Sequence, residues 1–359
     1  MFKLELKKYK DFDWIMAAAA TVIFILGLLF LFSSTYSYKV DYVMKQIMWF
    51  LAGCLVFMLM ININYRKIVG VGSIFYFLIM FFLSAVLIFG SRRLGAQRWL
   101  TIGSFNIQPS EFAKLFITIS LVQYMANHKN YKSARSIFIS ISMIALPFIL
   151  ILKEPDLGTA LMLVPILFAL LYVWGAPVRY LFSMIICGVL SSPFAWFLLK
   201  DYQKDRLLVF VNPGLDPLGA GYTIIQSRIA IGSGGLFGKG WLSGTQNQLN
   251  FLAERHTDFI FSVAGEEWGL FGCVLLVGLY YLLIRRAIMI ADKTDDPCGR
   301  LLATGLTVMI GIQVIVNISM TTGFMPVVGL PLPLVSYGGS SLLVTMAALG
   351  LLESIAIHR

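Results

Sequence analysis

The run IMAAAATVIFILGLLFLF, from Ile15 to Phe32, decides the fold class of this chain. It contains no charged side chain, and it shows no polar face at helical spacing of the kind that a helix in a soluble core would keep. An apolar run of this length is sufficient to cross a bilayer. Lysines precede it and no small-residue cleavage site follows it, which indicates a signal anchor that is retained.

The composition extends this conclusion from one segment to the whole chain. Of 359 residues, 58% are hydrophobic and 13% are charged, whereas about 25% of residues are charged in soluble domains. The sequence therefore predicts an all-α polytopic membrane protein. The net charge of +10 is spread thinly, without a basic cluster interleaved with aromatic residues, so nucleic acid is not an expected partner. Anionic lipid headgroups or a phosphorylated lipid fit this charge.

Ten transmembrane helices are expected, within a single domain that spans residues 1–359. An even number of spans places both chain ends on one side of the membrane. The expected spans are residues 14–33, 44–62, 70–90, 110–127, 136–153, 157–175, 179–199, 258–285, 300–321 and 338–356.

Basic residues orient these spans, because cytoplasmic loops are enriched in Lys and Arg. One set of connections carries most of them and should be cytoplasmic, together with both termini: Lys3, Lys7, Lys8, Lys10, Arg66, Lys67, Lys129, Lys132, Arg135, Arg179, Arg285, Arg286, Lys293, Arg300 and Arg359. The connection at residues 200–257 then faces outward between the seventh and eighth helices, and at about 58 residues it has the length of a functional loop. Arg92, Arg93 and Arg98 run against the trend, and anion binding is one explanation.

The stretch from Gly219 to Gly269, GAGYTIIQSRIAIGSGGLFGKGWLSGTQNQLNFLAERHTDFIFSVAGEEWG, is the most polar and glycine-dense part of the chain. Asp258 lies where this loop re-enters the membrane, beside apolar Phe259 and Ile260. Such a setting desolvates a carboxylate while leaving it reachable, so Asp258 is a candidate general base. The alternative is that Thr257 or Asp258 caps the following helix.

Basic residues and glycines of the same stretch could accommodate a phosphorylated leaving group. Arg228, Lys239 and Arg255 supply cations for charge that develops on pyrophosphate oxygens. Glycines between residues 232 and 240 let backbone amides approach a phosphate closely. The alternative is an ordinary flexible loop.

Charged residues in or beside other predicted spans are further candidates. Glu111 and Lys114 share a helix face and could pair with each other. Glu154 and Asp156 flank Pro155 in a tight outward turn. The segment from Gly323 to Ser341 contains three prolines, so it is either a re-entrant segment packed on protein or a rigid turn in which Ser336 or Ser340 caps the tenth helix. Either arrangement would help to wall the outward cavity.

Five stretches resemble the SEDS family (shape, elongation, division and sporulation), and within it the RodA branch. They lie in the same order along the chain as in that family, and with the ten spans the resemblance covers essentially the whole chain. The sequence has Ala253 where the family pattern has proline before the Glu. The stretches are RRLGAQRWLTIGSFNIQPSEFAKL (residues 92–115), KEPDLGTAL (153–161), DPLGAGYTIIQSRIAIGSGGLFGKGW (216–241), GTQNQLNFLAERHTDFIF (244–261) and PLPLVSYGGSS (331–341).

The resemblance implies an inverting peptidoglycan glycosyltransferase that polymerises lipid II on the outer face of the bacterial cytoplasmic membrane during cell-wall elongation. Asp258 matches the family's essential aspartate, with the implied role of deprotonating the acceptor 4-hydroxyl. The residues expected to bind substrate are Arg98, Glu111, Lys114, Asp156, Gln226, Arg228, Lys239, Glu254, Arg255 and His256. A lateral opening between helices is expected for the polyprenyl tail.

The resemblance also implies protein partners. These are a class B penicillin-binding protein, whose transmembrane helix docks on the chain, and other membrane proteins of the elongation complex. The sequence shows no cofactor motif and no metal-ligand cluster, although a divalent cation that bridges pyrophosphate and one carboxylate would leave no signature.

Two other functions compete with polymerisation. A lipid II flippase or other transporter would also use many helices and intramembrane charges, but no inverted repeat is visible and the polar candidates gather on one side. A non-catalytic scaffold for the penicillin-binding protein would have no need of the Asp258 side chain.

Overall fold

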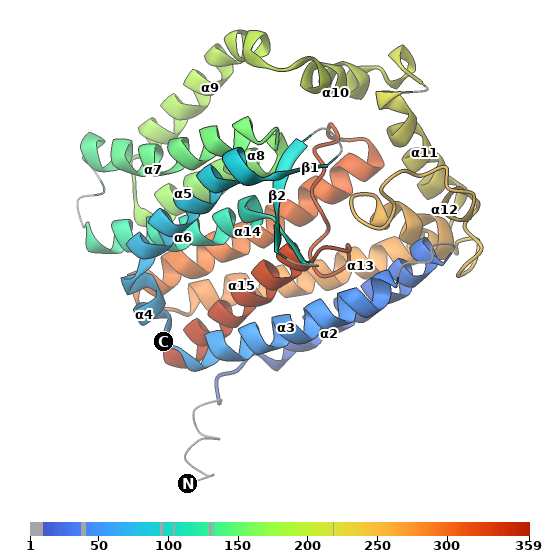
Figure 1. Cartoon of the computed structure of the whole chain (residues 1–359). Coiled ribbons are helices and arrows are strands. Elements are labelled where there is room, and N and C mark those ends of the chain that lie inside the picture. The colour runs from blue at the N-terminus through green and yellow to red at the C-terminus, as the bar shows by residue number, and fades with distance from the viewer. Residues whose placement is uncertain are drawn as a thin grey trace.

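The computed structural model describes residues 10–36, 41–93, 96–102, 105–128, 131, 133–217 and 219–359, and it shows a helical bundle with one small sheet (Figure 1). Its long helices are α2 (Trp14–Thr35), α3 (Tyr42–Asn62), α5 (Gly72–Phe89), α6 (Pro109–Asn127), α7 (Ala134–Lys153), α8 (Leu157–Trp174), α9 (Val178–Leu198), α13 (Ile260–Asp292), α14 (Pro297–Thr322) and α15 (Gly339–His358). Shorter elements are α4 (Tyr65–Gly70), β1 (Ser91–Arg93), β2 (Ala96–Ile102), β3 (Phe105–Ile107), α10 (Asp201–Val211), η1 (Pro213–Leu215), α11 (Ala220–Ser233) and α12 (Thr245–Gln248).

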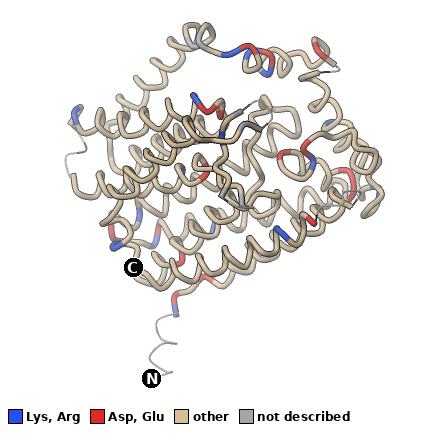
Figure 2. Tube along the Cα trace, in the orientation of Figure 1, with Lys and Arg blue, Asp and Glu red and all other residues tan. Residues whose placement is uncertain are grey.

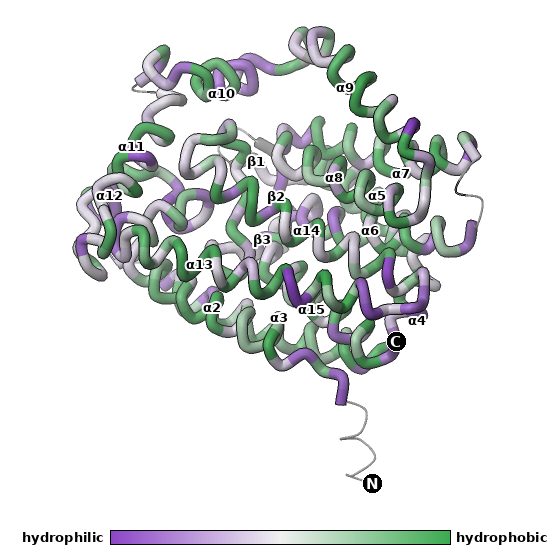
Figure 3. The backbone as a smooth tube through the Cα atoms, turned by 180° about the vertical axis from the view of Figure 1, so that it is seen from behind, coloured by the Kyte–Doolittle hydropathy of each residue, from purple (hydrophilic) through white to green (hydrophobic). Residues whose placement is uncertain are grey.

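Each of the ten predicted spans has a helical counterpart. Eight of these helices are long and apolar enough to cross a membrane, and the described part of α9 adds a shorter apolar helix, Val178–Phe194. The remaining counterpart, α6, carries Glu111 and Lys114 near its start. Figure 2 shows few charged residues along the helices, and Figure 3 shows hydrophobic colouring over most of the bundle. The prediction of an all-α polytopic membrane protein is confirmed.

Helix α15 forms the centre of the bundle. In the most apolar 18-residue stretch of α15, 89% of the residues are buried, so other parts of the protein surround this helix on nearly every side. Small residues permit this enclosure, because a side chain on Gly350 would meet the Phe57 carbonyl oxygen of α3 at 2.8 Å. The first described residues lie close to the C-terminus, since Asp11 and Arg359 lie 4.0 Å apart. The start of α2 and the end of α15 therefore lie at the same end of the bundle.

Aspartate side chains fix the starts of several helices. Asp13 Oδ1 accepts the Met16 N–H at 3.0 Å to begin α2, and Asp41 Oδ1 accepts the Met44 N–H at 2.8 Å to begin α3. Asp156 and Asp296 cap α8 and α14 in the same way. Each carboxylate satisfies an amide that has no partner inside the helix, which explains why these spans begin where they do.

The third connection contains a sheet that the sequence interpretation omitted. Strands β1, β2 and β3 form an antiparallel meander in which Ser91 pairs with Trp99 and Leu100 pairs with Ile107. The strands are only three to seven residues long and lie in a segment interrupted by glycines, so no run of alternating residues is long enough to predict them. The sheet matters for the site because β2 carries Arg98.

Residues 200–257 are more helical than the predicted loop. Helices α10 and α11 occupy much of this segment. In α11, Ile224, Ser227 and Ala230 are buried at intervals of three residues and form the face that packs on the bundle. Ser227 Oγ donates to the Thr321 carbonyl at 2.6 Å and lies 2.7 Å from Ser262 Oγ. The many glycines at both ends of α11 favoured the prediction of a loop over that of a helix.

The glycine-dense stretch after α11 packs on α13. Gly269 interrupts α13 with φ 64° and ψ −157°, a conformation that only glycine adopts readily. At this break the amides of Lys239 and Gly240 donate to Glu266 and Glu267 carbonyls at 3.0 Å each. In return, the Leu270 amide donates to the Gly235 carbonyl at 2.9 Å. The predicted eighth span is thus a helix in two parts.

We expect Gly269→Ala to lower the melting temperature of the detergent-purified protein by roughly 3–10 °C. Alanine would be strained at this φ, and its Cβ would lie 2.4 Å from the Gly238 nitrogen. Gly278→Ala on the same helix is the matched control, because a Cβ there meets no heavy atom within 4 Å. Equal melting temperatures for the two variants would show that the break does not depend on glycine.

Candidate active site

Asp258 lies in a tight turn just before α13. The amides of Thr257 and Asp258 donate to the Glu254 carbonyl at 3.1 Å each, and that of Phe259 donates to it at 3.3 Å. Helix α13 begins at Ile260 without a side-chain cap hydrogen bond. The alternative that Thr257 or Asp258 caps this helix is therefore wrong, and Asp258 is a half-buried residue just before the helix.

The proline-rich segment between α14 and α15 supports the turn from behind. Ser336 Oγ donates to the Thr257 carbonyl, and the Tyr337 amide donates to the His256 carbonyl at 2.9 Å. Asn317 of α14 donates to the Asp258 carbonyl at 3.0 Å. A Cβ on Gly329 would lie 3.2 Å from Asp258 Oδ2. The segment packs on protein and forms one wall beside Asp258, as its prolines predicted.

The electrostatic surroundings of Asp258 suit a base that titrates near neutral pH. Burial raises the pKa of its carboxyl from 3.8 to about 7, and the Glu254 carboxylate adds to the rise. The guanidinium groups of Arg206 and Arg98 oppose this rise in pKa, while Asp156 supports it. The structure thus brings Arg98, Asp156 and Glu254 to the surroundings of Asp258, as the sequence interpretation proposed for a polar site.

Arg98 is held in place by the turn between α7 and α8. Its Nε donates to the Glu154 carbonyl at 3.2 Å, a terminal nitrogen donates to the Pro155 carbonyl, and another lies 3.9 Å from Asp156 Oδ1. Asp156 is itself fixed, because Oδ2 accepts from Gln108 and Ser110 at 3.0 Å each. This network orients the guanidinium group before any ligand binds.

Arg206 is a site residue that the sequence interpretation missed. It lies on α10, in the segment taken for a loop, and donates to the Val327 carbonyl at 3.1 Å. Tyr202, one turn earlier, lies 3.3 Å from the Pro155 carbonyl, so α10 adjoins the turn that holds Arg98. Its only sequence signal is the charged run DYQKDR, which by itself predicts nothing more than a solvated surface.

Glu154 is a buried carboxyl next to this network. Its exposed fraction is 0%, and neither carboxyl oxygen has a hydrogen-bond partner among the described residues. Burial and the neighbouring Asp156 raise the pKa of Glu154 to about 9, although Arg98 lowers it. The Glu154 carboxyl is therefore largely neutral at pH 7.

Glu111 and Lys114 form a buried ion pair, as one of the two interpretations expected. Lys114 Nζ lies 3.0 Å from Glu111 Oε2 and donates to Gln313 Oε1 of α14 at 2.7 Å. The two side chains are 1% and 3% exposed. The ammonium group is thus directed to α6 and α14, and the prediction that these residues bind substrate stays untested.

Lys239 and Arg255 are engaged away from Asp258. Lys239 Nζ lies 2.7 Å from Glu266 Oε1 and donates to Thr245 at 2.8 Å. Arg255 is 2% exposed and donates to the Ser34 and Asn247 carbonyls. These contacts fasten the segment after α11 to α2 and α13, and the prediction that both residues bind substrate stays untested.

The remaining candidates lie on two sides of the turn. Gln226 is half-buried and Arg228 is exposed on α11, where the Arg228 side chain passes close to Gly323. His256 packs with ring centroids 5.0 Å from Tyr42 and 6.2 Å from Tyr337, and burial lowers its pKa. His256 is therefore neutral at pH 7. Within the described ranges, no three His, Cys, Asp or Glu residues are placed to hold a metal ion.

Comparison with known proteins identifies the family. The family model described as "Cell cycle protein" (FTSW_RODA_SPOVE) matches residues 13–359. The chain is 44% identical over 308 residues to the peptidoglycan glycosyltransferase MrdB of Escherichia coli K12, covering 86% of this chain and 83% of MrdB.

Two solved structures share its fold. A chain from a peptidoglycan synthase complex that coordinates polymerization and crosslinking aligns with a TM-score of 0.83 at 35% identity, over 96% of this chain and 97% of the other. The rod shape determining protein RodA of Thermus thermophilus aligns with a TM-score of 0.73 at 30% identity, over 97% of each chain. The chain belongs to the SEDS family of cell cycle proteins.

Proposed function

We propose that this chain is an inverting peptidoglycan glycosyltransferase that polymerises lipid II into β-1,4-linked glycan strands during cell-wall elongation and releases undecaprenyl pyrophosphate. The observation that carries the proposal is the Asp258 carboxyl, which lies just before α13 and has a pKa of about 7. The positive charges of Arg98 and Arg206 act on this carboxyl. Relatives named as peptidoglycan glycosyltransferases support the same reaction. The family match over residues 13–359 supports a single domain.

The reaction uses Asp258 as general base. The acceptor 4-hydroxyl oxygen bonds to the anomeric carbon of the donor while the bond from that carbon to the pyrophosphate oxygen breaks. The hydroxyl proton passes to the Asp258 carboxylate, and undecaprenyl pyrophosphate leaves. One direct displacement inverts the α-linked donor to a β product without a covalent enzyme intermediate.

Arg98 and Arg206 stabilise the charge that develops on the leaving pyrophosphate. They are the cations that act on the Asp258 carboxyl, and backbone carbonyls already orient both of them. Preorganised cations lower the barrier because they need no rearrangement as charge develops. Asp156 positions Arg98 and is expected to act on substrate only through it.

The polyprenyl tail of the substrate is expected to lie beside α9. Apolar side chains such as Phe182, Ile186 and Phe197 are exposed along this helix, which stands apart from the rest of the bundle (Figure 1). Helix α10, which carries Arg206, follows α9 directly. A tail in contact with α9 could remain in hydrocarbon while the pyrophosphate reaches Arg206.

The chain is an integral protein of the bacterial inner membrane, and we assign both termini to the cytoplasm. Basic residues accumulate at the end of the bundle where the residues before α2 lie close to Arg359, which is the arrangement of cytoplasmic loops. Asp258 precedes α13, whereas Arg286, near the other end of α13, binds Asp13 beside the termini. This arrangement supports an active site on the outer face, and we assign a class B penicillin-binding protein of the elongation complex as the partner there.

The test of this function is polymerisation of fluorescent lipid II by the purified chain together with its cognate penicillin-binding protein. We expect ladders of glycan strands, and a mock purification from cells that lack the chain should give none. Absence of product with a correctly folded complex would contradict the proposal and favour lipid II transport or a scaffold role. Transfer of labelled lipid II across vesicle membranes would then distinguish those two functions.

The same assay should show a rate that depends on pH through Asp258. The general base must be ionised, and its pKa of about 7 lies well above the ordinary value near 3.8. The rate at low substrate concentration should therefore fall about tenfold per pH unit below 7 and level off above it. A profile that is flat between pH 5 and 8 would show that no base with this pKa limits the reaction.

A further inference from the structure

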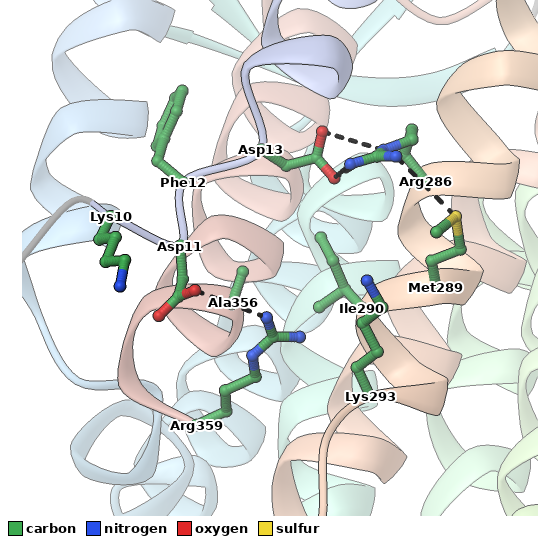
Figure 4. A pocket seen from close by; sticks show the side chains of 10 residues that line it. All are labelled: Lys10, Asp11, Phe12, Asp13, Arg286, Met289, Ile290, Lys293, Ala356 and Arg359. Carbon is green, nitrogen blue, oxygen red and sulfur yellow. Dashed lines mark hydrogen bonds and ion pairs between the residues drawn. The ribbon is translucent and has the colours of Figure 1, made fainter.

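Figure 4 shows a cavity of about 170 Å³ beside the last turns of α13, whereas Asp258 precedes the start of this helix. Three separate parts of the chain form it: the residues before α2, the last turns of α13 and the end of α15. Six of its lining residues are ionisable: Lys10, Asp11, Asp13, Arg286, Lys293 and Arg359. No step of glycosyl transfer uses these residues.

Ion pairs account for part of this charge. Arg286 binds Asp13 through two nitrogens at 2.7 Å each, and Arg359 lies 4.0 Å from Asp11. Beneath them the Asp13 amide donates to the buried Glu353 carboxylate at 2.9 Å. These contacts hold the residues before α2 against α13 and α15, and they leave the arginines with a carboxylate partner each.

Two lysines of the cavity have no such partner. Lys10 and Lys293 are exposed, and neither side chain makes an ion pair or hydrogen bond with another residue in the described part of the chain. They approach the cavity from the residues before α2 and from the end of α13 (Figure 4). Because the two arginines are already paired with carboxylates, the two lysine ammonium groups give this cavity a net positive charge. An anion could bind to them.

Apolar residues adjoin this charge. Trp14 is 73% exposed at the start of α2, directly after Asp13, and its ring packs edge-on against Phe12 with centroids 4.6 Å apart. Exposed tryptophan at the end of a membrane span is typical of the headgroup region. Ile15 and Ile288 extend the exposed apolar surface from the cavity along α2 and α13.

We propose that this cavity binds the phosphate headgroup of an anionic phospholipid, with Lys10 and Lys293 contacting the phosphate and the acyl chains lying along α2 and α13. Basic pockets between transmembrane helices on the cytoplasmic side commonly take such headgroups. The adjoining apolar surface favours a lipid over a free phosphate, which would gain nothing from it. The inference does not depend on the glycosyltransferase reaction.

Native mass spectrometry of the full chain in detergent tests the proposal. The probes are phosphatidylglycerol and zwitterionic phosphatidylcholine, with inorganic phosphate and glycerol 3-phosphate as soluble phosphates. Lys10→Gln/Lys293→Gln should weaken phosphatidylglycerol binding about 30-fold and leave phosphatidylcholine binding unchanged. Lys10→Arg/Lys293→Arg should retain binding, which separates loss of charge from loss of fold.

Lys67→Gln/Arg135→Gln is the matched control, because it removes two exposed basic residues from connections at the same end of the bundle. It should bind phosphatidylglycerol as the wild type does. Equal weakening by both double variants would overturn the site in favour of general surface charge. Retained binding by the Lys10/Lys293 glutamine variant would also overturn it, as would binding of the soluble phosphates to the wild type without binding of phosphatidylglycerol.

Discussion

Asp258→Asn is expected to lower the rate of lipid II polymerisation by about 10² to 10⁴-fold, the range that a positioned general base contributes. Asparagine keeps the size of the side chain but cannot accept the proton of the acceptor hydroxyl. The fold should survive, because the helix that follows uses no side-chain cap and Asp258 is anchored through its backbone carbonyl to Asn317. The measurement is the initial rate of glycan strand formation with saturating penicillin-binding protein.

Asp201→Asn is the matched control for this variant. Asp201 begins α10, and its side chain is 100% exposed and 3.8 Å from Lys204, so the same chemical change there should leave the rate within about twofold. Both proteins should have the melting temperature of the wild type and retain the partner. An Asp258→Asn rate within a few-fold of the control would mean that another group accepts the proton.

The transmembrane helices could be predicted because apolar runs such as Ile15 to Phe32 are a local property. Asp258 could be selected because it lies where a polar stretch meets an apolar run. The sequence could not, however, distinguish a general base from a residue that caps the following helix. That distinction depends on where α13 begins, and Phe259 at its N-cap position follows from the turn around the Glu254 carbonyl.

The rest of the site depends on contacts between distant segments. Arg206 reaches Asp258 through the path of α10, and Arg98 through a short sheet, neither of which a local pattern reveals. Conversely, Lys239 and Arg255 are near Asp258 in sequence but fasten the loop to α13 and α2. Charge type and sequence proximity therefore select kinds of residue but not where the fold places them, and the substrate roles of Lys239 and Arg255 stay predictions.

Lys114→Met is expected to lower the free energy of unfolding by about 3–5 kcal/mol, because it leaves the Glu111 carboxylate buried without a cation. Denaturant titration followed by helical circular dichroism measures this loss. Lys45→Met on α3 is the matched control, since Lys45 is exposed and should tolerate the change. Equal stability of these two variants would contradict a structural role for the ion pair.

A double variant separates the two roles that Lys114 could have. Glu111→Leu/Lys114→Met removes both charges, and replacing a buried pair by apolar residues is often neutral, so most of the lost stability should return. Some loss should remain, because Gln313 Oε1 also loses the Lys114 ammonium as its donor. If Lys114 instead binds the donor pyrophosphate, the double variant would be stable yet show a raised KM for lipid II. Recovery of both stability and activity would assign the pair to packing between α6 and α14, and leave Arg98 and Arg206 as the cations of the active site.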